Sequence, residues 1–358
     1  MDKNTVIGLV IIGLILSVFT IFNKPSEEEL KERQAKIEQE RKQMEEADSS
    51  IDAGEVTAIT NTDSTYVEGA TSITNDSTKT IQTTNNQNSK GNLIRLENEK
   101  LIIDFNTKGG QVAAVRLKEY ETYHNYAKFD DKIEPLVFFK NGDATNGIEF
   151  PYDGGNMNTA NELFSIKSQS KDKIVFELKK EGNQVIEFIY QLKKDAYDID
   201  YTVNMRGFAG KVTPKNVMLN WNASLRKTER LFSEQRRVST VCFKYQEEGF
   251  SWLSEMGTKE EICEDKLDWV SFKQSYFSSF INPENGFAKE GSRLDVVQYE
   301  KGSEKEWSHL KDFKALVNLN ISNVDNGSVK MNWFFGPNDY KTLTSYDDDY
   351  DVVLNYGC

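Results

Sequence analysis

Cysteine and histidine are scarce in this sequence, and their scarcity argues against several kinds of chemistry. The 358 residues include three cysteines and two histidines. No Cys-x-x-Cys pair occurs, and neither His124 nor His309 stands at metal-ligand spacing from a second ligand or in a recognisable relation to a nucleophile. We therefore expect no metal, no cofactor and no enzymatic activity.

The cysteines leave one structural question open. Cys242 and Cys263 can form a disulfide in an oxidising compartment, or they can remain as two unpaired buried thiols. Their spacing is compatible with both states.

Basic residues are fewer than acidic residues in this sequence. The sequence has 57 acidic and 44 basic residues, which give a formal net charge of -13 at pH 7. Nucleic-acid phosphates would be repelled by such a chain, so we expect no nucleic-acid partner and a well-dispersed exterior.

Long apolar runs are rare as well, and the sequence contains one. The seventeen residues Val6–Phe22 carry no charge, and as a helix they reach the lower length limit for crossing the ~30 Å hydrocarbon core of a bilayer. A cleaved signal peptide is the rival interpretation. It needs a basic start and a small-residue cleavage site, whereas this sequence starts MDKNT and leaves the run through bulky residues before Pro25. We expect an uncleaved membrane anchor over residues 1–25.

The charges around this run leave its orientation open. A simple count of positive charges places the N-terminus outside, because only Lys3 precedes the run. A large hydrophilic domain can nevertheless be translocated regardless of such charges. The basic residues that follow the run are Lys24, Lys31, Arg33, Lys36, Arg41 and Lys42.

A charged helix is predicted over residues 26–48. Ser26 with Glu29 forms a capping box. The apolar residues Leu30, Ile37 and Met44 recur every seven positions and make one narrow stripe, not the two positions per heptad of a coiled coil. This pattern favours a solvated helical stalk over a coiled-coil dimer.

A linker is predicted over residues 49–90. Thr, Ser and Asn supply 21 of its 42 residues, and it contains no Trp or Phe. Such a composition cannot bury enough apolar surface to offset the entropy of ordering, so we expect disorder.

The globular part is predicted over residues 91–346 and consists mainly of strands. Period-two alternation is clearest where Ile174, Phe176 and Leu178 lie between polar neighbours. About ten or more such runs indicate a large antiparallel β-sandwich. The other runs are 101–105, 112–117, 136–139, 186–192, 199–205, 217–221, 241–245, 313–321 and 329–335. One short helix is expected over 338–346, with Asn338 as its cap.

Three further motifs have a structural and a functional interpretation. The pair Gly109-Gly110 predicts a hairpin turn with positive φ and lacks the third glycine of a phosphate-binding loop. The acidic run 347–351 begins like a calcium loop but has Val352 at the glycine position and Cys358 at the glutamate position, which favours a solvated acidic turn. The aromatic stretch 269–280 suits a carbohydrate or peptide cleft, but core packing is the simpler interpretation.

Four segments of the sequence resemble the YidC/Oxa family of membrane protein insertases, in particular its Bacteroidetes members. The first is the opening segment MDKNTVIGLVIIGLILSVFTIFNKP. The second, LENEKLIIDFNTKGGQVAAVRLKEY, matches the family's first two strands and their glycine turn. The others are WVSFKQSYF and FFGPNDYKTL. The residues that carry the likeness are Phe105, Thr107, Gly109, Gly110, Val115, Leu117, Tyr120, Trp269, Val270, Gln274, Tyr276, Phe277, Gly336, Pro337 and Tyr340.

The resemblance implies a fold, a location and partners. The fold is a β-supersandwich of the galactose-mutarotase type with a few short helices. The location is the cell inner membrane, with the N-terminus in the cytoplasm and the globular domain in the periplasm. The implied role is the insertion, folding and assembly of inner-membrane proteins, with Sec translocon components and nascent membrane proteins as partners.

The resemblance also implies a missing part. Family members continue from an acidic tail, here 347–358, into five further spans that hold the insertase groove, and no groove residue can be carried over to this sequence. We expect either a fragment or a truncated product.

Two other functions stay open at this stage. One is a membrane-tethered carbohydrate-binding or mutarotase-like periplasmic protein, which would need an acid and a base in its cleft, although the two histidines have few such partners in the sequence. The other is a stalked structural protein held by its anchor.

Overall fold

The computed structural model describes residues 91–127, 134–347 and 349–354, which belong to one compact unit, Asp76–Cys358. The predicted anchor, stalk and linker lie outside the described residues. Each helix of the described part is too short or too polar to cross a bilayer.

The described residues form nineteen strands in three antiparallel sheets. The four-stranded sheet has the order β1-β2-β3-β4, the nine-stranded sheet β13-β12-β15-β16-β19-β10-β9-β8-β7, and the six-stranded sheet β14-β17-β18-β11-β5-β6. Their bounds are β1 Leu93–Glu97, β2 Leu101–Asn106, β3 Gln111–Leu117, β4 Leu136–Phe139, β5 Ala144–Tyr152, β6 Gly155–Asn158, β7 Ser165–Gln169, β8 Lys173–Lys179, β9 Val185–Leu192, β10 Asp198–Arg206, β11 Met218–Arg226, β12 Thr240–Tyr245, β13 Gly249–Trp252, β14 Lys259–Cys263, β15 Leu267–Lys273, β16 Phe277–Pro283, β17 Ser292–Val297, β18 His309–Asn318 and β19 Asn326–Pro337.

The helices of the described part are short. They are α3 Tyr123–Ala127, α4 Phe232–Val238 and α5 Tyr340–Tyr346, with the 3-10 turns η1 Thr159–Asn161, η2 Pro214–Asn216 and η3 Tyr350–Val353.

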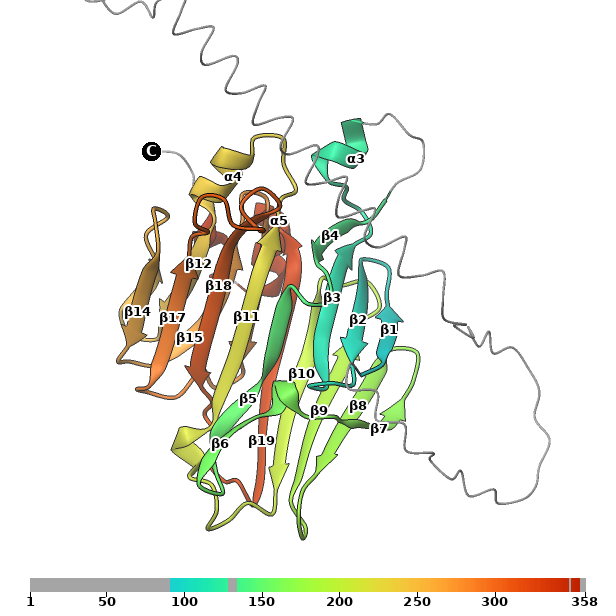
Figure 1. Ribbon diagram of the computed structural model, residues 1–358, viewed down its shortest axis with the longest axis vertical. Helices are drawn as coiled ribbons and strands as arrows, with labels where there is room; N and C mark the ends of the chain where they lie inside the picture. Colours follow the sequence, from blue (N-terminus) through green and yellow to red (C-terminus); the bar gives the residue numbers. More distant parts are fainter. Residues whose placement is uncertain (1–90, 128–133, 348, 355–358) are drawn as a thin grey trace, which may run out of the picture. The chain divides into compact units, whose positions relative to one another are not determined.

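The two smaller sheets lie side by side and face the nine-stranded sheet across an aromatic core (Figure 1). The side-chain amide of Asn146 in β5 donates to the carbonyl oxygen of Val112 in β3 at 3.0 Å, which joins the two small sheets. Across the core, Trp221 of β11 stacks on Phe272 of β15 with ring centroids 3.7 Å apart. The predicted fold class, a mainly β antiparallel sandwich with few short helices, is confirmed.

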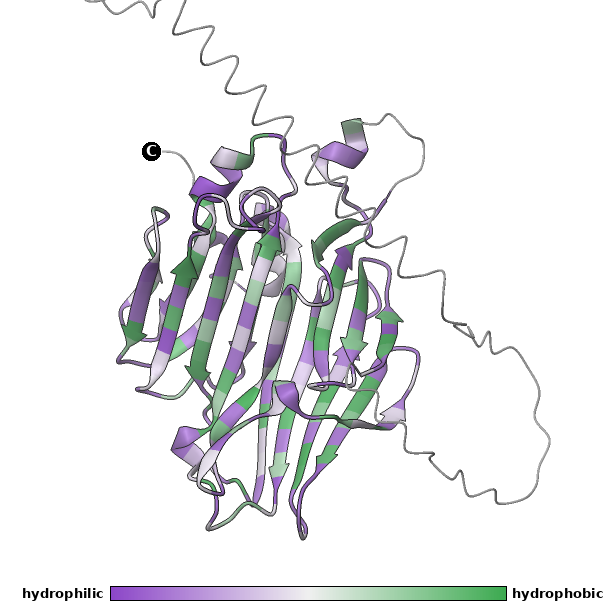
Figure 2. Ribbon diagram, in the orientation of Figure 1, coloured by the Kyte–Doolittle hydropathy of each residue, from purple (hydrophilic) through white to green (hydrophobic). Residues whose placement is uncertain are grey.

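Period-two alternation places the expected side chains in the core. Ile174, Phe176 and Leu178 of β8 are buried, and alternating hydrophobic and hydrophilic residues are visible along the strands in Figure 2. The opposite face of the same sheet is partly covered too. Glu177 and Glu187 are buried there beneath ion pairs whose cations come from Lys167, Lys179 and Arg206.

The hairpin between β2 and β3 has the predicted turn. Gly109 has a φ of 85° and Gly110 a φ of 58°, a region that side chains other than glycine rarely adopt. A Cβ atom at Gly110 would lie 3.0 Å from the ring of Phe164. Glycine is therefore required here both by the backbone conformation and by the close approach of a ring.

The predicted cap of the last helix is wrong by one residue. Asp339, not Asn338, caps α5, and its carboxylate accepts a hydrogen bond from the backbone N–H of Thr342 at 2.9 Å. Asn338 instead donates its side-chain amide to the carbonyl oxygens of Gln274 and Ser275. A side chain just before a helix can cap that helix or bind a neighbouring turn. The side chain of Asn338 binds the turn between β15 and β16.

Folded structure continues beyond Tyr346, where an acidic tail was predicted to begin. Tyr350 of η3 is buried and stacks on Phe280 with centroids 4.0 Å apart. The flanking acids are held as well, because Asn282 donates to Asp347 and Lys244 pairs with Asp349. Burial of the aromatic ring outweighs the local acidity and keeps this segment on the sheet.

The two described cysteines are unpaired thiols. Cys242 and Cys263 are both buried and neither forms a disulfide. Burial raises the pKa of the Cys242 thiol to about 12 and that of the Cys263 thiol to about 11. Of the two states that the spacing allowed, the structure has the free thiols.

Candidate interaction surface

The residues that carried the family resemblance fall into two groups in space. Tyr120 follows β3, and its ring meets that of Phe277 edge-on with centroids 5.2 Å apart. Phe277 is in turn paired with Pro337 across β16 and β19. The described chain thus brings together, at one end of the sandwich, Tyr120, Gln274, Tyr276, Phe277, Gly336, Pro337 and Tyr340.

The other motif residues serve the core and the far turn. Phe105 and Leu117 are fully buried, and Trp269 is exposed to only 1%. Gly109 and Gly110 lie at the opposite end of the β2–β3 hairpin from Tyr120. A ligand on the surface could not reach the three buried side chains.

The turn between β15 and β16 is held by buried amides. Gln274 is fully buried, and its backbone N–H donates to the carbonyl oxygen of Phe277 at 2.8 Å. Its side-chain oxygen accepts from the amide of Gln235 in α4 at 3.1 Å. The backbone N–H of Asn338 donates to the carbonyl oxygen of Tyr276 at 2.7 Å. Helix α4, this turn and the start of α5 therefore form one connected support.

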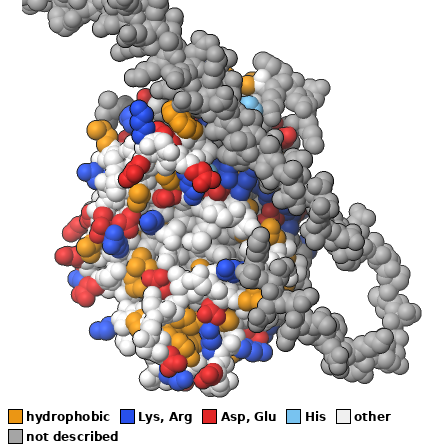
Figure 3. All heavy atoms as spheres, viewed as in Figure 1, with side chains coloured by type: hydrophobic (Ala, Val, Ile, Leu, Met, Phe, Trp, Pro, Cys, Tyr) orange, Lys and Arg blue, Asp and Glu red, His pale blue; other side chains and the backbone are white. Residues whose placement is uncertain are grey.

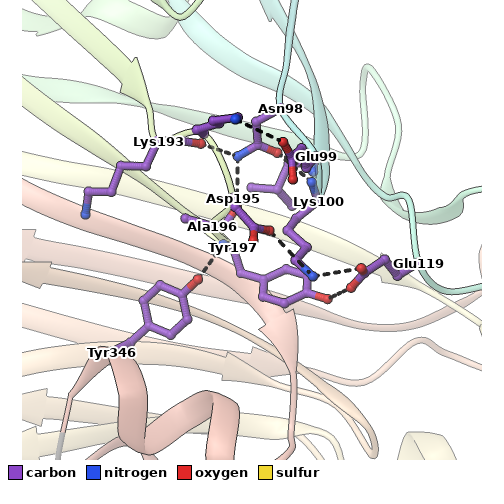
Figure 4. Close-up of polar contacts among 11 residues, drawn as sticks. Asn98, Glu99, Lys100, Glu119, Lys193, Asp195, Ala196, Tyr197 and Tyr346 are labelled. Carbon is purple, nitrogen blue, oxygen red and sulfur yellow. Dashed lines mark hydrogen bonds and ion pairs between the residues drawn. The ribbon is translucent and has the colours of Figure 1, made fainter.

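A second support surrounds Tyr197 in the turn between β9 and β10 (Figure 4). The Tyr197 hydroxyl donates to the carboxylate of Glu119 at 2.5 Å, and the backbone N–H of Tyr197 donates to the hydroxyl of Tyr346 in α5 at 2.6 Å. Lys100 lies 2.7 Å from Glu119 and 3.6 Å from Asp195. Four segments distant in sequence are joined here.

The charges at this junction shift two pKa values in opposite directions. The hydrogen bond from Lys100, followed by that from Tyr197, lowers the pKa of the Glu119 carboxyl. Burial and the acceptor Glu119 raise the pKa of the Tyr197 hydroxyl well above its usual range. Glu119 is therefore an anion and Tyr197 a neutral donor at neutral pH.

Exposed aromatic and apolar side chains lie in or beside α3, α4, the β15–β16 turn and α5. The backbone N–H of Tyr123 in α3 donates to the carbonyl oxygen of Thr228, and the guanidinium of Arg230 lies 5.8 Å from the Tyr123 ring. We name the following set the tyrosine rim: Tyr123, Tyr126, Leu231, Tyr276 and Tyr340, exposed to 40%, 69%, 65%, 62% and 55%. Tyrosine and arginine are enriched at protein interfaces, because they combine a large apolar area with a polar group.

No pattern in the sequence marks the polar cluster that the structure forms where β5, β11 and β18 lie together. The Nε2 atom of His309 lies 3.1 Å from Asp143 Oδ1, and its Nδ1 atom lies 2.8 Å from Ser308 Oγ. Arg226 donates to Asp143 from Nε at 2.5 Å and from Nη2 at 3.1 Å. The expectation that the histidines have few acidic partners is wrong for His309, because its partner stands 166 residues away.

This cluster is arranged as a clamp. Burial raises the pKa of the Asp143 carboxyl, but the hydrogen bonds from His309 and Arg226 lower it more, to about 2. Asp143 also accepts from the backbone N–H of Lys140 at 2.9 Å. Both carboxylate oxygens and both ring nitrogens are engaged within the protein, and the two side chains are only 8% and 6% exposed.

Two described acids after α5 are engaged with side chains of the sheet, Asp347 with Asn282 and Asp349 with Lys244. In the described part, no group of three or more His, Cys, Asp or Glu side chains is placed to hold a metal ion.

Comparison with known proteins decides the family. The family model described as the YidC periplasmic domain matches residues 93–358. The chain belongs to the YidC periplasmic domain family. The match includes all the strands and helices described above, so the tyrosine rim, the Tyr197 junction and the Asp143 clamp are all features of a YidC periplasmic domain.

Relatives of this chain extend the match toward the N-terminus. The membrane protein insertase YidC of Phocaeicola vulgatus is 28% identical over 97% of this chain and 52% of its own length. That of Bacteroides fragilis is 27% identical over 97% of this chain and 53% of its own length. The chain thus spans about half the length of the curated relatives that it matches.

Solved structures show a weaker likeness. A galactose mutarotase related enzyme from Lactobacillus acidophilus has a TM-score of 0.39 and 8% identity, covering 68% of this chain and 97% of that one. An aldose epimerase homologue from C. elegans has a TM-score of 0.40 and 10% identity, covering 69% and 99%. At these values the likeness carries no argument about function.

Proposed function

We propose that this chain is the N-terminal part of a membrane protein insertase and takes part in the insertion, folding and assembly of inner-membrane proteins. One observation carries the proposal. Relatives named membrane protein insertase YidC align over 97% of the chain, which is more than the periplasmic domain alone and therefore reaches into the predicted anchor.

The proposed placement has the N-terminus in the cytoplasm, Val6–Phe22 in the inner membrane and the domain in the periplasm. The uncharged run supports the span. The strong polarity of the remaining chain supports a domain outside the lipid. Protease added to spheroplasts should digest the domain, and a domain protected until the cells are lysed would contradict this topology.

The proposed role of the domain is contact and not catalysis. Its partners are Sec translocon components and nascent membrane proteins, and the tyrosine rim is the contact surface. Support comes from the exposure of the rim and from its attachment to a rigid base through Gln274 and Tyr197. Preorganised aromatic side chains lose little entropy on binding, so they suit a docking surface.

Site-specific photocrosslinking tests this role. A photoreactive residue in place of Tyr276 or Tyr340 should crosslink to translocon components or to a nascent membrane protein in cells. The matched control is Glu181, an exposed residue in the β8–β9 turn at the opposite end. Equal crosslinking from all three positions, or none from the rim, would contradict the proposed surface.

The carbohydrate-binding alternative is not proposed. Its acid and base would have to come from groups such as His309 and Asp143, and both are buried and engaged with other protein groups. Calorimetric titration with monosaccharides gives an independent check, and micromolar binding would revive the alternative.

A further inference from the structure

The strand β13 ends the nine-stranded sheet and has one open hydrogen-bonding edge. Its other edge pairs with β12, and the backbone N–H of Leu253 donates to the carbonyl oxygen of Val241 at 2.9 Å. Because hydrogen-bonded and non-hydrogen-bonded pairs alternate along an antiparallel ladder, the main-chain groups of Phe250 and Trp252 point away from β12. Within the described residues, no strand pairs with that side.

The side chains of this edge form a fixed aromatic platform. Trp252 is 55% exposed, and its ring stacks on Phe250 with centroids 5.4 Å apart and an interplanar angle of 26°. The Phe250 ring lies 6.2 Å from that of buried Trp269. A strand added beside β13 would place its side chains about 5 Å from this platform, the usual spacing of cross-strand neighbours.

The chain on either side of the platform carries an excess of negative charge. The segment Gln246–Lys266 contains seven carboxylates and two lysines. Exposed Glu247, Glu248 and Glu264 form no ion pair in the described part of the chain. Figure 3 shows acidic, basic and apolar side chains gathered along the left edge of the molecule, over β14 and β17.

The charge decides which occupant fits the edge. Exposed edge strands are commonly protected by lysine, proline or a bulge, and the β13 sequence Gly-Phe-Ser-Trp has no lysine or proline. A second copy of this chain would bring a second set of carboxylates and be repelled. A cationic strand would be attracted, and its ammonium or guanidinium groups could lie over the Trp252 ring.

We propose that β13 is a docking edge for an extended, positively charged polypeptide segment. The segment adds to the sheet as a further strand, its main chain pairs with Phe250 and Trp252, and its basic and apolar side chains cover the aromatic platform. This goes beyond the function proposed above and does not rest on it, because the test uses a synthetic peptide.

The test measures binding of a heptapeptide of alternating lysine and valine to the full chain in detergent. Calorimetry gives the affinity, and the fluorescence of exposed Trp252 gives an independent signal. The first control peptide has the same residues with N-methyl groups on alternate positions, which removes the donors of one edge without changing the charge. We expect it to bind at least about tenfold more weakly. A glutamate–valine peptide should not bind measurably.

Protein variants locate the site. Trp252→Ala should weaken binding about tenfold, while Ile166→Ala, which removes an exposed apolar side chain from β7 at the other edge of the same sheet, should leave it unchanged. The double change Glu247→Gln and Glu248→Gln should reduce both the affinity and its dependence on salt. Thermal unfolding of each variant checks that the fold is kept.

Several outcomes would overturn the proposal. Equal binding of the N-methylated peptide would show attraction by charge alone. An unchanged affinity for Trp252→Ala, or no binding of the basic peptide, would remove β13 as the site. Dimerisation of the chain that Trp252→Ala abolishes would assign the edge to a second copy.

Discussion

The clamp of Asp143, Arg226 and His309 supports a quantitative prediction for Asp143→Asn. The pKa of the Asp143 carboxyl falls from 3.8 to about 2 on folding. One pKa unit corresponds to about 1.4 kcal/mol, so the ionised carboxylate contributes about 2 kcal/mol to the free energy of unfolding. Asparagine keeps the shape but loses the charge, and it leaves the half-buried guanidinium of Arg226 without its anion.

The sign of the pH dependence follows from the direction of the shift. A carboxyl whose pKa is lower in the folded state stabilises the fold fully above its unfolded value of 3.8, and this stabilisation is lost as the pH falls through about 2. We expect Asp143→Asn to lower the free energy of unfolding by about 2 kcal/mol at pH 6. The difference from the unmodified chain should shrink steadily below pH 4.

Urea unfolding of the full chain in detergent provides the measurement. Buried Trp221, Trp269 and Trp333 report the loss of the core by fluorescence. Asp195→Asn is the matched control. Its carboxylate is 61% exposed and lies 3.6 Å from Lys100, so the change should cost less than about 0.5 kcal/mol. Asp143→Asn with unchanged stability at pH 6, or with a loss that does not depend on pH, would refute the clamp.

Three further predictions concern local structure. Gly110→Val should lower the free energy of unfolding by about 3 kcal/mol or more, because it combines positive φ with a clash against Phe164; Gly182→Ala, at a positive φ in open space, should cost less by thermal or urea unfolding. The buried thiols of β12 and β14 should resist iodoacetamide at pH 8 until urea unfolds the domain, and mass spectrometry would reveal any labelling of the native state. Asp339→Ala should cost about 1 kcal/mol through loss of the α5 cap, whereas an unchanged midpoint of unfolding would show that the cap is dispensable.

Local periodicity was enough to predict most of the fold. Alternation such as Ile174, Phe176 and Leu178 marks a strand and its buried face without knowledge of any partner, because side chains on a strand alternate between the two faces of a sheet. The paired glycines 109 and 110 predicted a turn for an equally local reason. Short motifs also pointed to the family, since their order along the chain is itself sequence information.

Strand register and the path of the chain decided the rest. Asp143 meets Arg226 and His309 only because β5, β11 and β18 are neighbours in one sheet, and no pattern in the sequence marks partners 83 and 166 residues apart. The same holds for Asn338, whose side chain binds the distant turn at Gln274 and leaves the helix cap to Asp339. Sequence determines which face of a strand is apolar, because that depends on neighbours along the chain. Tertiary structure determines which polar groups meet, because that depends on which strands pair and in what register.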